Sequence, residues 1–305
     1  MKNMKTAVGM LCLAGILSLG MGTTVFAEDG DSHYPVTITT YNYENEPVEM
    51  TFEKAPEKVF AYANSNIEEL LALGLGDKIV AAYGLDGDVR EDLKDEFDKI
   101  QYMDTKPSKE EVVAMEPDFI AAWYSSFSDD WLSDVSFWQE RDVNTYMSLN
   151  SSAKGPASEF PRTIEDEYED ILNLGKIFDC EDKAEEIVDQ MKGEIDKVKE
   201  HVEGTDPLSV AVLEDEGDSF RVYGTETLGG NIPETLGAEL KLGAENSENV
   251  GAEDLIAADP DVLFMINYDG FMTADEAIAD ITDNPAYASL SAVKNNKVFS
   301  VNLNE

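Results

Sequence analysis

Hydrophobic and polar positions along the chain fall into alternating short apolar runs and longer amphipathic stretches. The short runs predict buried strands, and the stretches between them carry apolar residues at helical spacing. The runs lie at 59–62, 79–83, 119–123 and 145–149 in the first half, and at 208–213, 220–223, 262–266 and 297–301 in the second. Strands that alternate with helices form mainly parallel sheets, so the pattern predicts an α/β fold.

A ten-residue motif occurs once in each half of the chain. KEEVVAMEPD spans 109–118 and AEDLIAADPD spans 252–261, and an apolar run follows each copy directly. The proline should end a short helix, because the residue before a proline is pushed out of the α region. The repeat therefore predicts two related lobes in which a short helix leads into a buried strand, and we expect the lobes to face a shared cleft.

A long amphipathic helix is predicted between the two copies of the motif, from Asp182 to Val202. Its apolar stripe consists of Ala184, Ile187, Val188, Met191, Ile195, Val198 and Val202, and its length is about 30 Å at 1.5 Å per residue. The expected organisation is a leader at 1–27, a first lobe at 28–180 with a β-hairpin over 34–52, a connecting helix at 181–203 and a second lobe at 204–305.

The N-terminus has the layout of a secretory signal peptide. Two lysines precede an uncharged apolar stretch over 6–24, and Val25-Phe26-Ala27 comes before the first acidic residue. This pattern predicts export with cleavage after Ala27; a transmembrane anchor is the alternative and would need a longer apolar core. Cys12 is preceded by a poor match to a lipoprotein cleavage box, so no lipid anchor is expected.

Composition excludes several classes of function. The chain has 64 acidic and 22 basic residues and a net charge of -42, which excludes nucleic acid as a partner because such a field repels phosphate. Cys180 is the only cysteine after the leader, so no intramolecular disulfide is expected. His33 and His201 are the only histidines, and a metal site built from imidazoles is therefore not expected. We predict no catalytic residue, no enzyme activity and no resident metal or cofactor.

Candidate ligand-binding residues follow the predicted strands. In open α/β sheets ligands bind outside the carboxyl ends of the strands, and aromatic side chains gather there. The candidates are Tyr62, Asn64, Tyr83, Trp123, Tyr124 and Phe127 in the first lobe, and Arg221, Tyr223 and Tyr268 in the second. Such rings suit a bulky, flat or chelate-like ligand. Alternatively, some rings cap the lobe cores, and Arg221 either pairs with a ligand carboxylate or hydroxamate or forms a surface salt bridge.

The order of these segments resembles that of a known family. KAPEKVF, NIEELLALGLGDKIVA, LGKIFDCEDKAEEIV and NPAYASLSAVKNNKVFSVN, together with the repeated motif, look like the substrate-binding proteins of ABC importers for iron complexes and cobalamin, the class III periplasmic binding proteins. The resemblance spans about residues 54–302. It implies two Rossmann-like lobes joined by one long helix, and an exported monomer that carries a ferric siderophore to the importer. Haem and cobalamin-like corrinoids are the alternative cargoes.

The resemblance also implies a partner, an ABC permease dimer in the membrane. By motif position, Glu110 and Glu253 match the glutamates with which such proteins dock onto permease arginines. Alternatively, both glutamates simply favour their helix N-termini through the dipole. Two functions of other classes stay open on the same fold: a chelatase-like enzyme, which would need a base in the cleft, and a surface sensor or adhesion module without cargo.

The chain departs from the family pattern in three ways. It lacks a lipoprotein box, which leaves its retention at a single-membrane cell unexplained. It ends at Glu305, soon after the last predicted strand, where the family normally continues through another helix, which raises the question of a truncated second lobe. It also has no obvious basic cluster at the strand ends, which argues against the more anionic siderophores.

Overall fold

The computed structural model describes residues 33–244, 249–268 and 272–303 of the chain. The predicted leader, its cleavage after Ala27 and the question of Cys12 lie outside these residues. Within the described ranges, no helix combines the length and apolar character needed to cross a bilayer.

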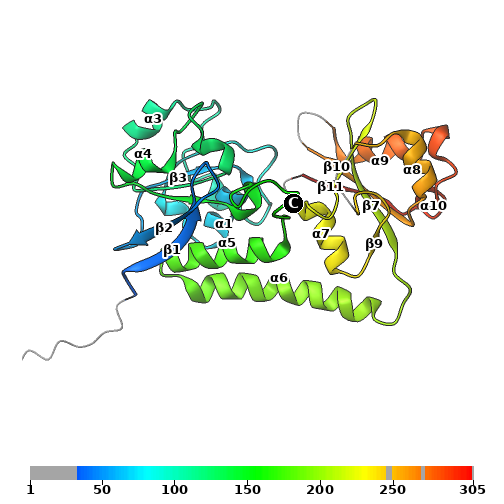
Figure 1. The fold of residues 1–305 in the computed structure, drawn as a ribbon, viewed down its shortest axis with the longest axis horizontal. Helices are drawn as coiled ribbons and strands as arrows, with labels where there is room; N and C mark the ends of the chain where they lie inside the picture. Colours follow the sequence, from blue (N-terminus) through cyan, green and yellow to red (C-terminus); the bar gives the residue numbers. More distant parts are fainter. Residues whose placement is uncertain (1–32, 245–248, 269–271, 304–305) are drawn as a thin grey trace, which may run out of the picture. The chain divides into compact units, whose positions relative to one another are not determined.

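Strands and helices alternate through both halves of the chain (Figure 1). The strands are β1 Val36–Tyr41, β2 Pro47–Phe52, β3 Val59–Tyr62, β4 Ile79–Tyr83, β5 Phe119–Ala122, β6 Asn144–Met147, β7 Ser209–Asp215, β8 Phe220–Val222, β9 Glu239–Leu240, β10 Val262–Asn267 and β11 Val298–Asn302. The α-helices are α1 Asn64–Ala72, α2 Lys94–Phe97, α3 Lys109–Ala114, α4 Val135–Gln139, α5 Ile164–Ile177, α6 Glu181–Val202, α7 Leu228–Thr235, α8 Ala252–Ala258, α9 Ala274–Thr282 and α10 Ser291–Lys294. Short 3₁₀ helices are η1 Gly76–Lys78, η2 Tyr124–Phe127, η3 Leu149–Ser151 and η4 Pro285–Tyr287.

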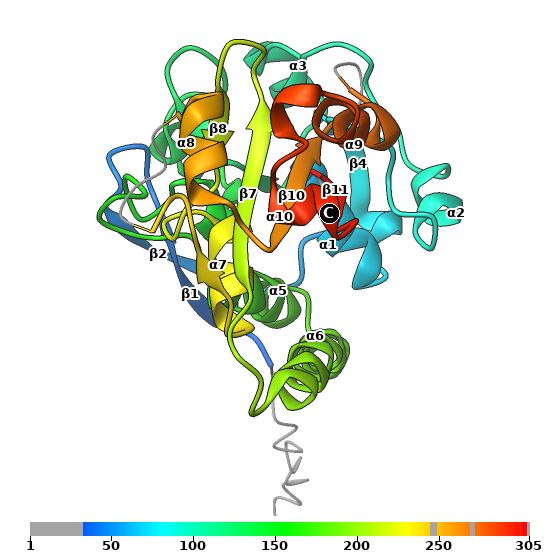
Figure 2. The ribbon, with the colours of Figure 1, turned by 90° about the vertical axis from the view of Figure 1, so that its right-hand side faces the viewer.

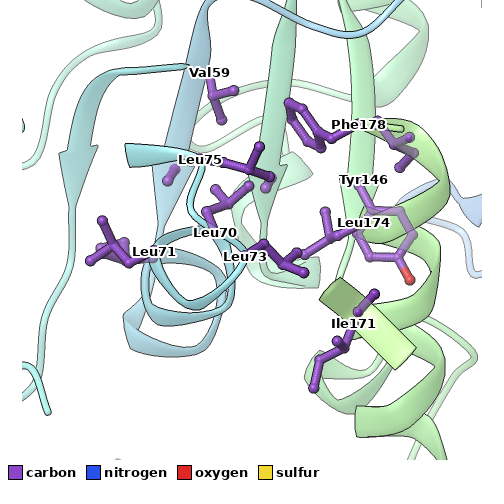
Figure 3. Close-up of a cluster of buried hydrophobic side chains, with 14 of the residues drawn as sticks. Val59, Leu70, Leu71, Leu73, Leu75, Tyr146, Ile171, Leu174 and Phe178 are labelled. Carbon is purple, nitrogen blue, oxygen red and sulfur yellow. The ribbon is translucent and has the colours of Figure 1, made fainter. Parts of the chain in front are cut away.

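The first lobe is built on a four-stranded parallel sheet in the order β4-β3-β5-β6. Its strands are apolar on both faces, as expected for a parallel sheet covered on both sides, and every residue of β5 is buried. On one face, side chains from β3, α1, β6 and α5 form a continuous apolar cluster that includes Val59, Leu70, Tyr146 and Leu174 (Figure 3). The predicted hairpin is confirmed as the antiparallel pair β1–β2.

The second lobe has its own sheet, in the order β11-β10-β7-β8, with β9 also paired to β7 (Figure 2). All pairs are parallel except β7–β8, which is antiparallel. Leu213, Leu263, Met265 and Ile281 are fully buried in its core. Two mainly parallel sheets and the long helix α6 confirm the predicted α/β class with two lobes.

The repeated motif forms the same structure in both lobes. α3 and α8 are each followed by a residue in the left-handed region, Glu116 with φ 51° and Asp259 with φ 42°. The residue before each proline has left the right-handed α region, as predicted, but it adopts the left-handed rather than the extended conformation that proline favours. The helices therefore end at the predicted point by a tighter turn than expected.

The final aspartate of each motif copy holds the first strand of the parallel strands in its lobe, β3 or β7. Asp118 accepts hydrogen bonds from the backbone N–H groups of Glu57 (3.0 Å) and Lys58 (2.8 Å), just before β3. Asp261 accepts one from the backbone N–H of Ser209 (3.1 Å), at the start of β7, and another from the Ser209 hydroxyl (2.7 Å). The motif thus links its own strand, β5 or β10, to the strand beside it.

α6 packs against α5 (Figure 1) along only part of its predicted stripe. Ala184 and Val188 are buried against the first-lobe core, whereas Val198 is 42% exposed. Ile195 and Val202 are only partly buried, so the stripe is covered less completely toward its C-terminal end and α6 is anchored mainly through its N-terminal half.

Two predicted helices need correction. The sequence predicts a helix at about Trp131 to Arg141, but the structure has only α4 there, because Ser133 is left-handed (φ 65°) and Asp134 then caps the helix through the Ser136 N–H. The sequence also predicts a helix after Gly229-Gly230-Asn231, and this helix, α7, starts earlier, at Leu228, because the Thr227 hydroxyl caps it by accepting from Gly230 N–H. α9 was not predicted.

We predict that Asp118 and Asp261 stabilise the folded protein to a similar extent. Asp118→Ala and Asp261→Ala should each lower the free energy of unfolding by about 1–3 kcal/mol, because each removes hydrogen bonds between a carboxylate and backbone N–H groups. Denaturant unfolding measures this, with exposed Glu185→Ala on α6 as the control.

The Asp261 contribution should also depend on pH. The hydrogen bonds from Ser209 hold the pKa of Asp261 below its ordinary value, so its stabilisation is present above about pH 4 and is lost as the pH falls through the lowered pKa. A difference in stability between the wild type and Asp261→Ala that stays constant down to the acid limit would contradict this role.

Candidate functional site

Three aromatic rings meet beside the carboxyl ends of β3 and β4. Tyr62 and Tyr83 stack with ring centroids 5.9 Å apart, and Trp131 lies edge-on to both, at 4.7 and 6.1 Å. We call Tyr62, Tyr83 and Trp131 the aromatic group. Tyr62 and Tyr83 were predicted as candidate ligand residues, whereas Trp131 was assigned to a helix. Trp131 donates from Nε1 to the Pro107 carbonyl (2.6 Å), a contact that no sequence spacing indicates.

A lysine adds positive charge to the aromatic group. Lys106 Nζ lies 4.2 Å from the Trp131 ring centroid, a cation–π geometry. No sequence pattern selects Lys106, because this residue belongs to an irregular segment between β4 and α3. The sequence shows no basic cluster at the strand ends. The structure nevertheless places one ammonium group, that of Lys106, at these rings.

Tyr62 is held in place by its neighbours and keeps its phenol proton. Burial, with smaller contributions from Asp86 and Tyr83, raises the pKa of Tyr62, so its hydroxyl is a neutral hydrogen-bond donor and acceptor at physiological pH. Gly84 has φ +89°, and a Cβ built there would lie 2.4 Å from Tyr62 Cε2. The ring position thus depends on a residue without a side chain at Gly84.

Trp123 connects β5 to the start of α1. Its Nε1 donates to Ser65 Oγ (3.0 Å), and its side chain is 39% exposed. Asn64, in contrast, is buried, and its Oδ1 accepts from the Asp86 backbone N–H (2.8 Å). Trp123 is therefore available to a ligand, while Asn64 shapes the turn after β4.

Tyr124 and Phe127 do not join the aromatic group. Tyr124 stacks on Tyr43 of the β1–β2 turn, with centroids 4.7 Å apart and planes inclined by 17°. Phe127 is fully buried in the first-lobe core. Its predicted contact with a ligand is corrected to a packing role, because the 3₁₀ turn η2 directs this ring inward.

Two of the second-lobe candidates, Arg221 and Tyr223, belong to an antiparallel strand or its end, where a parallel strand was expected. β8 runs antiparallel to β7, so its end does not share the carboxyl edge of β7, β10 and β11. Arg221 instead lies opposite Glu214 in the β7–β8 register. Its Nη1 is 3.7 Å from Glu214 Oε2, and its guanidinium lies 5.3 Å from the Tyr223 ring centroid. The salt-bridge alternative for Arg221 is therefore observed.

Glu214 joins this arginine to a tyrosine. Tyr223 donates its hydroxyl proton to Glu214 Oε2 (2.8 Å), and burial together with this bond raises the pKa of Tyr223. Tyr268 directly follows β10, is half-buried, and also raises the pKa of Tyr223 by its charge. The second lobe thus has two neighbouring tyrosines, Tyr223 and Tyr268, and the half-exposed Arg221, whose positive charge Glu214 partly neutralises.

In each helix of the repeated motif, one of two neighbouring acidic residues caps the helix and the other does not. Glu111 on α3 and Asp254 on α8 turn back to accept from the N–H groups of Ser108 (2.8 Å) and Gly251 (2.9 Å). Those bonds, with the Ser108 hydroxyl, lower the pKa of Glu111.

The preceding residue of each helix points outward. Glu110 and Glu253 are exposed and make no hydrogen bond or ion pair with any residue in 33–244, 249–268 or 272–303. Helix capping is therefore performed by the next acid in each copy, which leaves Glu110 and Glu253 available to a partner.

Two sheets in related lobes, the repeated motif and the long helix between them match one family throughout. The profile of the periplasmic binding protein family matches residues 59–302. The chain belongs to the periplasmic binding protein family.

Relatives of this periplasmic binding protein are known in sequence and in structure. It is 24% identical to the uncharacterized ABC transporter substrate-binding lipoprotein YvrC of Bacillus subtilis, over 95% of this chain and 87% of that protein. It is 24% identical to the petrobactin-binding protein YclQ of the same organism, over 81% and 74%. A periplasmic binding protein from Veillonella parvula has a similar structure, with a TM-score of 0.82 and 31% identity over 88% and 85%.

We predict that Gly84 is required for the position of Tyr62. Gly84→Ala should lower the free energy of unfolding by about 2–4 kcal/mol, which combines the cost of a left-handed alanine with that of displacing the ring. Gly217→Ala is the matched control, since Gly217 has φ +91° but no atom within 4 Å of a built Cβ.

The difference between the two variants isolates packing on Tyr62, and denaturant unfolding measures it. Equal losses of stability in both would show that backbone conformation alone matters at Gly84.

Proposed function

We propose that this chain is an extracytoplasmic solute-binding protein that captures a ferric siderophore and delivers it to an ABC importer. The observation that carries the proposal is the aromatic group with Lys106, placed at the carboxyl edge of a periplasmic binding protein sheet. Relatives named for petrobactin and for ferric citrate add support for an iron chelate as cargo.

The side chains suit a chelate with planar, anionic arms. Tyr62 and Tyr83 are partly buried and supply rings for stacking, Trp131 supports them from the first-lobe core, and the neutral Tyr62 hydroxyl can hydrogen-bond to a chelate oxygen. A net charge of -42 repels anions at a distance, so local cations are needed. Lys106 in the first lobe and Arg221 in the second provide them.

Binding is favoured over catalysis by the positions of the histidines. His33 contacts the α5–α6 junction, and His201 lies in the last turn of α6. Neither belongs to the aromatic group, so the chelatase-like alternative has no imidazole base there.

Export and assembly complete the proposal. We place the mature protein outside the cytoplasmic membrane as a monomer, after removal of residues 1–27 and without a lipid on Cys12. Delivery requires a permease, and the outward-facing Glu110 and Glu253 suit docking onto basic side chains at two matching points.

The cargo prediction is tested by titrating the protein with a ferric catecholate, a ferric hydroxamate, haem and cobalamin while following tryptophan fluorescence. One of the ferric siderophores should bind saturably. Tyr83→Ala should weaken it at least about tenfold, as expected for an aromatic anchor. Lys106→Gln should weaken it about two- to fivefold, the size of a cation–π or exposed ionic contact.

Lys192→Gln is the matched control, because Lys192 also lies over an aromatic ring, 5.1 Å from the centroid of Tyr168, but on the α5–α6 surface. The affinity of Lys192→Gln for the siderophore should equal that of the wild type. Saturable binding of haem or cobalamin alone would reassign the cargo, and folded protein that binds none of the four would contradict a transport role.

The docking prediction separates uptake from binding. The double variant Glu110→Arg, Glu253→Arg should keep its ligand affinity, while uptake of the ferric chelate by cells falls at least about tenfold, since two opposite charges meet like charges at the permease. Glu185→Arg with Glu200→Arg, two exposed acids of α6, controls for the change in net charge. Undiminished uptake in the Glu110, Glu253 variant would contradict the docking role.

A further inference from the structure

His33 lies at the junction between α5 and α6 and is not part of the aromatic group. Its Nε2 is 2.7 Å from the Lys176 carbonyl oxygen. A carbonyl only accepts hydrogen bonds, so Nε2 carries a proton and donates it. Nδ1 on the other side of the ring faces two carboxylates, Glu181 Oε1 at 3.2 Å and Asp179 Oδ1 at 3.4 Å.

These three ligand atoms lie close enough together to converge on one ion. They all lie within 4.8 Å of one another. In a tetrahedral site with metal–ligand bonds of about 2.0–2.2 Å, neighbouring ligand atoms are about 3.3–3.6 Å apart. The two distances from His33 Nδ1 agree with that spacing, whereas a charge-assisted N–H···O bond is typically about 2.7–2.9 Å.

We infer that His33, Asp179 and Glu181 form a binding site for a divalent transition metal of the zinc type. One imidazole nitrogen and two carboxylate oxygens are ligands that zinc accepts, with water in the fourth position. The partly exposed carboxylates, at 58% for Asp179 and 38% for Glu181, leave room for that water.

The surroundings of the imidazole are those of a metal ligand. Metal-binding histidines usually donate their second ring N–H to a carbonyl or carboxylate, which fixes the tautomer and the ring orientation, and the bond to Lys176 does this here. The His33 side chain is itself only 19% exposed. The sequence predicts no metal site. This site could not be found from sequence spacing, because His33 lies more than 140 positions from the two carboxylates.

A bound metal would link the segment before β1 to the junction of α5 and α6. Tyr34 already donates its hydroxyl proton to the Ile177 carbonyl (2.7 Å), so the metal would strengthen an existing attachment. The segment that begins at His33 would then be held at the helix that joins the lobes.

Zinc binding to the untagged, chelator-stripped protein, measured by calorimetry in excess magnesium, tests the site. Magnesium occupies weak carboxylate sites on this acidic chain and leaves a site that contains imidazole to zinc. The wild type should bind one zinc ion. His33→Gln and Asp179→Asn should each weaken binding at least about tenfold. Asparagine tolerates the left-handed conformation of Asp179, φ 55°, so that variant keeps the backbone.

His201→Gln, which removes the only other histidine, is the control and should bind zinc like the wild type. The inference is overturned if the wild type binds no zinc in excess magnesium, or if His33→Gln binds it equally well. A loss of thermal stability in His33→Gln, without zinc binding by the wild type, would show that the three side chains form an ion pair only.

Discussion

The carboxylates of Asp118 and Asp261 establish the frame on which the two lobes depend. Asp118 accepts from two backbone N–H groups just before β3, Asp261 accepts from the Ser209 N–H and hydroxyl at the start of β7, and each follows a short helix and a left-handed residue. These bonds align β3 with β5 and β7 with β10. Because parallel strands share one carboxyl edge, the alignment also decides which loops can meet a ligand.

Much of this frame could be predicted from the sequence, because it rests on local chemistry. Each pattern predicts one structure. The Pro-Asp steps end a helix, the apolar runs form buried strands, and the spacing of apolar residues over α6 forms a helix. The direction of β8 could not be predicted in this way, since three residues of strand carry no signal that distinguishes parallel from antiparallel pairing. The exposed end of α6 at Val198 was likewise hidden, because a stripe indicates which face is apolar and not how much of it is covered.

The candidate site was predictable only in part. Tyr62 and Tyr83 end strands and were found for that reason. Trp131 and Lys106 reach the same place through irregular segments, where side-chain direction depends on individual turns such as the one at Ser133. Phe127 shows the opposite error, since a ring in the turn after a strand can point inward. The acids of α3 and α8 needed atomic positions as well, because sequence cannot tell which of two neighbouring carboxylates caps the helix.

A binding edge, a pair of outward-facing glutamates and an anchored N-terminal segment occur together in one periplasmic binding protein. We propose that a ferric chelate binds at Tyr62 and Tyr83, which Trp131 supports. The most direct measurement is the anomalous scattering of iron in crystals grown with a saturating ferric siderophore. One iron peak beside these rings is expected; a peak at another surface, or no peak although chelate binding is demonstrated in solution, would contradict binding at this site.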